Sequence, residues 1–213
     1  MTLNLTDLRI SYTKGGLTEA DLTEDPFELF RQWLQQALDV KATEPNAMTL
    51  ATVDASGKPN ARIVLLKDVG KRHLRFFTNY GSSKGKDLQE NPHAATTFWW
   101  PELERQVRFR GPVEKIDPEQ SAAYFRIRPR ESQLGAWASE QSKIISSREE
   151  LEKKFEQIRK KFSGEEIPVP GFWGGFDLAA DEIEFWQGRQ GRLHDRILYS
   201  YSNKKWNITR LQP

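Results

Sequence analysis

Two short basic clusters hold the side chains best suited to bind a planar anion. The C-terminal cluster is Arg192-Leu193-His194-Asp195-Arg196. The upstream cluster is Arg128-Pro129-Arg130-Glu131-Ser132, and Tyr124 precedes it. A guanidinium offers a flat fork of donors that binds phosphate and also stacks on aromatic rings. The two clusters together therefore indicate a site for an aromatic phosphate.

The upstream cluster contains a possible phosphate clamp. Tyr124 and Arg128 are four residues apart, so a helix places both on one face. Ser132 follows just after Pro129, where we expect that helix to end. A phosphate held by these groups would gain about 1.5–3 kcal/mol from each charge-assisted hydrogen bond. The same residues also fit an ordinary surface helix end.

A second candidate anion site lies earlier in the chain. Arg62 and Lys67 bracket the run RIVLLK, and their odd spacing points them to opposite faces of a regular strand, so they could serve different ligands. Ser82 and Lys84 lie where we expect a helix to begin, which favours anion binding. The segment GSSKGK does not match GxxxxGK[ST], and the chain contains no GxGxxG. Side chains would therefore have to hold a phosphate, unless these residues are simply exposed strand and turn charges.

Uncharged polar and aromatic residues complete the candidate chemistry. They suit a heteroaromatic ring with an amide-like edge, although glutamines are also common on surfaces. This group consists of Gln106, Gln141, Ser142 and Trp186.

Composition excludes several classes of function. The 213 residues fit one domain, and a net charge of +2 is too small for a general nucleic-acid binder. The chain has no cysteine, and His73, His93 and His194 are far apart, so we expect neither thiol chemistry nor a metal site. The first residues lack the apolar core of a signal peptide, and no apolar run approaches the ~18 residues of a membrane span. We therefore expect a soluble, cytoplasmic protein.

The pattern of elements favours a β-barrel with flanking helices over a parallel sheet. Asp25 and Pro26 predict the start of a helix whose apolar stripe packs in the core: Phe27, Phe30, Trp33, Leu34, Ala37 and Leu38. Short strands with close turns are expected at 48–53, 62–67, 74–78, 95–100, 106–113, 182–187, 196–201 and 206–211. Further helices are expected after the turn at 79–83 and over 118–127 and 147–162. Residues 1–22 are polar and aperiodic, which alone indicates a disordered arm.

The chain resembles the pyridoxamine/pyridoxine 5′-phosphate oxidases, FMN enzymes that make pyridoxal 5′-phosphate. The resemblance covers nearly the whole chain, in family order, through the segments LRISYTKGGL, ARIVLLK, FFTNYGSSKG, LERQV, YFRIRPRESQLGAWAS, EQS, FWGGF, IEFWQG and RLHDR. RPRESQLGAW and RLHDR are the most specific of these. The resemblance implies a mainly β, α+β fold: a Greek-key-like split β-barrel that binds FMN at the interface of a homodimer. It also implies a single domain over 23–213, with a dimerisation part from about 170, and it makes the arm at 1–22 a lid.

The resemblance further implies the activity and the site. Pyridoxamine and pyridoxine 5′-phosphate would be oxidised at C4′ while dioxygen becomes hydrogen peroxide. The implied FMN contacts are Arg62, Ile63, Val64, Leu65, Leu66, Lys67, Phe77, Thr78, Ser83, Lys84, Gln106, Gln141, Ser142, Trp186 and Arg196. The implied substrate contacts are Arg9, Tyr12, Lys67, Tyr124, Arg128, Ser132, Arg192 and His194. Arg192 and His194 would lie at the pyridine ring and act in catalysis by positioning it.

Two departures from the family pattern leave alternatives open. The family usually has an arginine at the position of Ser83, so a cation that would help to hold the FMN phosphate is missing, and weaker FMN retention follows unless Lys86 or another cation substitutes. Phe77 stands where a tyrosine is common. One alternative is a related split-barrel flavin oxidase acting on another aromatic ring, such as a phenazine precursor. The other is a carrier of flavin or pyridoxal phosphate without catalysis.

Overall fold

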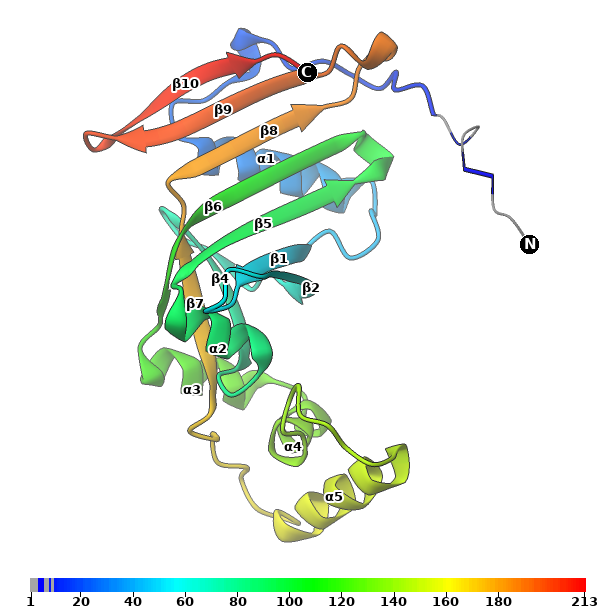
Figure 1. The fold of residues 1–213 in the computed structure, drawn as a ribbon, viewed down its shortest axis with the longest axis vertical. Helices are drawn as coiled ribbons and strands as arrows, with labels where there is room; N and C mark the ends of the chain where they lie inside the picture. The colour runs from blue at the N-terminus through cyan, green and yellow to red at the C-terminus, as the bar shows by residue number, and fades with distance from the viewer. Residues whose placement is uncertain (1–3, 6–7, 9) are drawn as a thin grey trace.

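The computed structural model describes residues 4, 5, 8 and 10–213, and within these an antiparallel sheet dominates the molecule (Figure 1). One continuous path of strands runs β10 (Lys205–Leu211), β9 (Asp195–Ser202), β8 (Glu182–Gln187), β6 (Arg105–Lys115), β5 (His93–Trp100), β1 (Ala47–Val53) and β2 (Pro59–Leu65). Off this path, β4 (His73–Asn79) pairs with both β3 (Asp68–Val69) and β7 (Trp173–Ala179). The predicted mainly β architecture with close turns is confirmed.

The long strand β6 turns the sheet into a split barrel. Its residues Arg105–Arg110 pair with β8, whereas Val113–Lys115 pair with β7. Gly111 lies at the change of partner, where a Cβ would stand 2.2 Å from the carbonyl oxygen of Ala179. Only glycine lets the two backbones approach this closely. The β3–β4–β7 group can therefore fold across the other strands.

The main core forms between the sheet and α1 (Pro26–Asp39), the blue helix of Figure 1. The predicted helix start is confirmed, because the Asp25 carboxylate accepts a hydrogen bond from the Phe27 N–H at 2.9 Å. The Phe30 ring lies 4.8 Å from that of Phe109. Leu38 is 51% exposed, so the predicted stripe is wrong at that position. It follows the buried Ala37 by about 100° around the helix, which turns it away from the sheet.

Three further helices build a smaller core beside β7. They are α3 (Pro118–Ile127), α4 (Arg130–Ala138) and α5 (Arg148–Lys161), and the buried members of this core are Phe125, Leu134, Phe162, Ile167 and Trp173. The prediction for α3 is confirmed to the residue, and that for α5 to within one residue at each end. Helix α4 was not predicted, because we took Pro129 only as the end of a helix. A proline is also tolerated at the start of the next helix, and here α4 follows it directly. Strand β7 was also missed, because two glycines weaken its strand pattern.

The remaining elements frame the site described below. Helix α2 (Ser83–Glu90) follows β4, as the sequence predicts. The described part of the N-terminal arm is extended except for one 3-10 turn, η1 (Glu19–Asp21). Two further 3-10 turns are η2 (Pro101–Leu103) and η3 (Gln190–Arg192). Within the described residues, no helix has both the length and the apolarity that a membrane span requires.

The main core predicts a contrast between two positions on α1. Truncating Phe30 to alanine leaves a cavity among buried rings and should lower the free energy of unfolding by about 3–5 kcal/mol. Leu38→Ala on the same helix should change it by less than about 0.5 kcal/mol, because that side chain is half exposed. Urea unfolding followed by circular dichroism measures both. Equal losses would contradict the packing described here.

Candidate functional site

A cavity of about 470 Å³ opens between the edge of the sheet and the helices α3 and α4. Its lining comes from β2, β4, α2, α3, α4 and β7. Among the described lining residues, three are cationic and none is a carboxylate: Lys67, Lys84 and Arg128. We name this the cationic cavity. Such a lining attracts an anion, since no acidic partner neutralises its charge.

One wall of the cationic cavity is aromatic. The rings of Phe77 and Tyr124 stack with centroids 4.0 Å apart, and Phe77 lies nearly parallel to Trp173 at 5.3 Å. These rings come from β4, α3 and β7, which explains why no single segment of sequence shows the wall. Trp173 was not predicted as a site residue. Its place directly before a glycine pair was the available signal, because small residues leave room for a large ring nearby.

Arg128 is held against this aromatic wall with part of its guanidinium unused. Its Cζ atom lies 4.7 Å from the Trp173 ring centroid, a cation–π contact. Burial lowers the pKa of Arg128 from its usual value, and Tyr124 opposes this shift. The buried Nη1 atom has no hydrogen-bond partner. A buried charged donor without a partner is costly, so this group is prepared for an anionic ligand.

Ser132 joins Arg128 and Tyr124 in the same cavity, as the sequence predicts. The local structure differs from expectation, because Ser132 lies in the first turn of α4. The N–H groups of Ser132 and Gln133 already donate to the carbonyl of Pro129, at 2.9 and 3.1 Å, so Ser132 contributes to the clamp through its hydroxyl.

Lys84 supplies a second buried cation at the start of α2. Its Nζ atom donates to the Gln141 Oε1 atom at 2.9 Å and to the Thr78 Oγ1 atom at 3.2 Å. Burial lowers the pKa of Lys84, the nearby Arg62 guanidinium lowers it further, and Asp87 raises it. The predicted grouping of Lys84, Thr78 and Gln141 is thus present in the structure. Ser83 is exposed in the first turn of α2 and adds no cation.

Arg62 lies beside the cationic cavity rather than on its lining. It donates to the Thr52 hydroxyl at 2.6 Å and lies 3.7 Å from the Asp87 carboxylate. Lys67 does line the cavity, so the two cations have different surroundings, as the sequence suggests. That prediction assumed that Arg62 and Lys67 lie on one strand and point to opposite faces because of their odd spacing. The assumption is wrong, because β2 ends at Leu65 and Lys67 lies beyond it. Ile63, Val64 and Leu65 line the cavity, whereas Leu66 is buried in the main core.

A second cavity, of about 400 Å³, lies at the other end of the molecule. Arg192, His194 and Tyr12 line it, together with Arg189, which the sequence analysis did not single out. Arg189 lies three residues before the predicted C-terminal cluster, and its charge so close to that cluster was the available signal. We name this the arm cavity, because residues of the N-terminal arm form one wall. Arg9 was predicted here but lies outside the described residues.

An aromatic cluster backs the arm cavity. The Trp186 ring lies 4.6 Å from the His194 ring and 5.6 Å from that of Tyr12. Gln106 is the cross-strand partner of Trp186 in β6 and β8. A single chain therefore does not bring the two predicted glutamines, Ser142 and Trp186 together. Gln141 lines the cationic cavity, while Ser142 is exposed with a left-handed backbone.

The position of the proton on His194 is set by its backbone neighbour. The Arg189 N–H donates to the Nδ1 atom of His194 at 3.1 Å. Nδ1 must therefore be unprotonated, which leaves the proton of the neutral ring on Nε2. Burial lowers the pKa of His194 from its usual value, Arg192 lowers it further, and Asp195 raises it. The ring is thus prepared to act as a neutral donor through Nε2.

Arg196 lies on neither cavity lining. Its Nε atom donates to the Glu184 carboxylate at 2.8 Å, and this bond raises the pKa of Arg196. Its Nη1 atom donates to the carbonyl of Gln212 at 2.9 Å. The guanidinium is therefore held at the C-terminal edge of the sheet, near the start of β9.

The two cavities lie far apart on one chain. The elements around the cationic cavity lie in the middle and lower parts of Figure 1, and η3 with the start of β9 lies at the top. The aromatic-phosphate site predicted from the two basic clusters is therefore not assembled within a single copy. Within the described part of the chain, no group of acidic, histidine or cysteine residues could hold a metal ion.

Comparison with known proteins gives consistent matches. A family profile described as pyridoxamine 5′-phosphate oxidase matches residues 34–162, and one described as the pyridoxine 5′-phosphate oxidase C-terminal dimerisation region matches residues 173–213. Proteins named pyridoxine/pyridoxamine 5′-phosphate oxidase are 52% identical in Gloeothece citriformis and 53% identical in Nostoc punctiforme, each over 100% of both chains. The relative of that name in Leptospira biflexa is 50% identical over 99% of both chains.

Solved structures share the same architecture. The crystal structure of PhzG from Burkholderia lata 383, in complex with tetrahydrophenazine-1-carboxylic acid, has a TM-score of 0.86. It is 28% identical, with 91% of this chain and 95% of that chain covered. A pyridoxamine 5′-phosphate oxidase-related, FMN binding protein from Nostoc punctiforme has a TM-score of 0.70 at 20% identity, with 86% and 97% covered. This second likeness shows the fold alone.

Proposed function

The chain belongs to the pyridoxamine 5′-phosphate oxidase family, and we propose that it is an FMN-dependent oxidase of pyridoxine and pyridoxamine 5′-phosphate. The alcohol or amine carbon C4′ of the substrate becomes the aldehyde of pyridoxal 5′-phosphate. Dioxygen is the second substrate and leaves as hydrogen peroxide, while the amine substrate also consumes water and releases ammonia. Relatives of that name over the full chain length support this activity.

One structural observation favours a phosphorylated substrate. Arg128 presents a buried, unpartnered guanidinium nitrogen in a cavity without a carboxylate among its described lining residues. Tyr124 and Ser132 place hydroxyl donors in the same cavity. A phosphate ester supplies the charge and the acceptor oxygens that this set lacks. We therefore assign Arg128, Tyr124, Ser132 and Lys67 to the substrate phosphate.

The residues beside this clamp fit FMN. Strand β2 ends the main path of the sheet, so the backbone groups of Ile63, Val64 and Leu65 that face away from β1 can pair with the polar edge of a flavin ring. Lys84 and Arg62 supply the cations for its phosphate, with Thr78 and Gln141 as neutral partners. When bound, FMN accepts a hydride equivalent from the substrate and passes the electrons to dioxygen. The protein contributes binding, orientation and exclusion of water.

We propose that two copies complete each site. Neither cavity alone offers both the phosphate clamp and the ring-binding residues, so the cationic cavity of one copy would face the arm cavity of another. Ile63 is 64% exposed and Leu65 38% exposed at the sheet edge, which suits an interface. On this proposal the predicted FMN contacts Gln106, Ser142, Trp186 and Arg196 act across that interface. The C-terminal part from about residue 170 would pair the copies, with residues 23–213 as one domain.

The arm cavity then positions the pyridine ring. Arg192 stacks on or beside the ring, and His194 donates from Nε2 to its polar edge. Tyr12 closes the cavity from the arm. No strong general base is assigned among these residues, so positioning is their main contribution. The predicted cytoplasmic location remains part of this proposal.

Anaerobic reduction tests the proposed function directly. The purified protein should be a yellow dimer whose flavin absorbance bleaches when pyridoxamine 5′-phosphate is added without oxygen. Admitting air should restore the colour and release one hydrogen peroxide per pyridoxal 5′-phosphate formed. A yellow dimer that never bleaches would favour the carrier alternative. Bleaching by an unphosphorylated aromatic alone would favour the related-oxidase alternative.

The phosphate assignment predicts a selective effect of Arg128→Ala. Losing its charge-assisted hydrogen bonds should raise KM for pyridoxine 5′-phosphate by about 10–100-fold. The KM for free pyridoxine should change by less than about threefold, because that substrate has no phosphate to lose. Arg126→Ala is the matched control, since Arg126 is an exposed arginine of the same helix paired with Glu166. Equal effects of Arg128→Ala on both substrates would remove the assignment.

The His194 assignment predicts its titration. Because the pKa of His194 is lowered, the ring should take up its proton at a lower pH than an ordinary histidine does. His194 has a higher pKa in the unfolded chain than in the folded one. The unfolded chain therefore binds the proton at a higher pH, and the free energy of unfolding decreases as the pH falls. NMR of the ring nitrogens, with the signal identified by its loss in His194→Gln, measures both the midpoint and the Nε2–H tautomer. A midpoint above 6.5, or a proton on Nδ1 at neutral pH, would contradict the assignment.

A further inference from the structure

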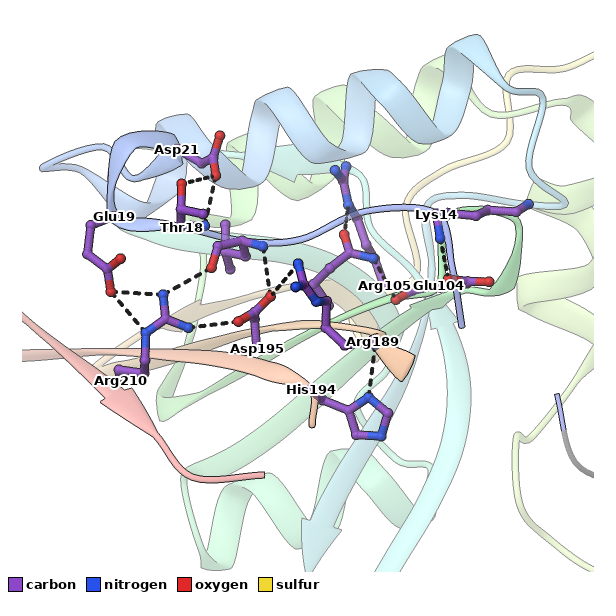
Figure 2. Close-up of polar contacts among 12 residues, drawn as sticks. Lys14, Thr18, Glu19, Asp21, Glu104, Arg105, Arg189, His194, Asp195 and Arg210 are labelled. Atoms are coloured by element: carbon purple, nitrogen blue, oxygen red, sulfur yellow. Dashed lines mark hydrogen bonds and ion pairs between the residues drawn. The ribbon is translucent and has the colours of Figure 1, made fainter. Parts of the chain in front are cut away.

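The described arm is attached to the sheet by two carboxylates far away in sequence (Figure 2). Glu104 binds the arm at Thr13 and Lys14, and Asp195 binds it at Leu17. These attachments lie on the C-terminal side of Tyr12, the arm residue that lines the arm cavity. These hydrogen bonds therefore fix the arm on the sheet just after the residue that lines the cavity.

Glu104 makes the tighter attachment. Its Oε2 atom accepts the N–H of Thr13 at 2.8 Å and the N–H of Lys14 at 2.9 Å. The residue is only 5% exposed, so this carboxylate depends on those two donors for its hydrogen bonding. The Lys14 ammonium adds a bond to the carbonyl of Glu102 at 2.7 Å.

The backbone of Glu104 connects the arm to the residues of the arm cavity. Its φ of 55° is left-handed, which a non-glycine residue adopts only when its surroundings hold it there. Its carbonyl accepts the N–H of Gly188 at 2.8 Å and the amide of Gln187 at 3.3 Å. Gly188 directly precedes Arg189, whose N–H fixes the His194 ring. One residue thus joins the arm to the segment that positions His194.

Asp195 makes the second attachment. Its Oδ2 atom accepts the N–H of Leu17 at 3.0 Å, and its Oδ1 atom accepts from Arg210 at 2.9 Å. Arg210 in turn donates to the carbonyl of Leu17 at 3.0 Å and to Glu19 at 2.9 Å. Both sides of the Leu17 backbone are therefore bound.

The attachments leave Tyr12 in close contact with the cavity wall. A Cβ on Gly188 would lie 2.7 Å from the Tyr12 Cγ atom and 3.1 Å from the Glu104 Cβ atom. The Tyr12 ring also packs edge-on against Trp186 and His194. Such contact needs an arm whose position is set to within about half an ångström.

We propose that Glu104 is a positioning residue for the oxidase reaction, with Asp195 as the second attachment. It holds the arm so that Tyr12 closes the cavity over the pyridine ring of the substrate. This inference rests on the proposed function. Glu104 is not a lining residue of either cavity, so it acts through Tyr12 and Gly188.

Arm attachment can be measured on the FMN-loaded protein without turnover. Trypsin cleavage after Lys14, identified by the mass of the released peptide, should be at least about tenfold faster in Glu104→Ala, because both backbone bonds are lost. Glu104→Gln keeps an acceptor oxygen of the same reach and should stay near wild type. The matched control is Asp177→Asn, which removes a partly buried carboxylate of β7 that is bound to Arg75 of β4, without touching the arm. It should leave cleavage after Lys14 unchanged.

Kinetics separate positioning from a merely structural role. Glu104→Ala should raise KM for pyridoxine 5′-phosphate about tenfold, leave kcat within about threefold and retain FMN. In a Tyr12→Ala background the same substitution should raise KM no further, because the effect passes through Tyr12. If Glu104→Ala does not fold, Gly188→Ala tests the same contact, since its methyl displaces Tyr12 and should raise KM alike.

The outcomes distinguish this inference from the proposed function. An active wild type whose KM is unchanged by Glu104→Ala or Gly188→Ala overturns the positioning role, whatever trypsin shows. An additive KM effect in the Tyr12→Ala background also overturns it. A wild type that binds FMN but never oxidises the phosphorylated substrates overturns the proposed function, while the trypsin result still decides whether Glu104 holds the arm.

Discussion

The structure depends on cations that are desolvated without being neutralised. Arg128 lies against Trp173 with a buried, unpartnered nitrogen, and Lys84 is bonded only to neutral oxygens. Burial lowers the pKa of both groups, which records the cost of keeping them charged there. Asp87 offsets part of this cost for Lys84, but it does not lie on the described lining of the cavity, where a carboxylate would compete with an anionic ligand. An anionic ligand would supply the partner that the Arg128 guanidinium lacks, and the aromatic wall offers a flat surface for stacking.

This constraint explains where the carboxylates near the site are placed. Asp87 pairs with Arg62 outside the lining of the cationic cavity, and Glu184 pairs with Arg196 at the far edge of the sheet. Glu104 and Asp195 bind backbone N–H groups of the arm. These four carboxylates thus bind other groups of the protein. None of them lies on the described lining of the cationic cavity.

Sequence predicted elements with local signals and missed features that depend on tertiary contact. The N-cap of α1, its apolar stripe except at Leu38, and the start of α3 at Pro118 are encoded within a few residues, so these predictions are confirmed. Helix α4 and strand β7 were missed because Pro129 and the glycines before Phe176 oppose the local pattern, and packing of Leu134 and Trp173 overrides it. The family resemblance predicted the site residues that composition could not identify. Neither source indicated Glu104, because its role lies in hydrogen bonds to a segment some ninety positions away.

Backbone strain marks the same places as the chemistry. Among described non-glycine residues, left-handed φ values occur at Glu104, Ser142 and Arg192, and elsewhere only in the turns after α1 and between β9 and β10. Turn residues adopt that conformation because the chain must reverse there. Glu104 is also a turn residue, because it ends η2 between the paired strands β5 and β6, and it is bound on its N–H, its carbonyl and its carboxylate. A strained residue persists only where the surrounding contacts determine it. Glu104, just before the start of β6, therefore binds the arm through its carboxylate and the end of β8 through its carbonyl.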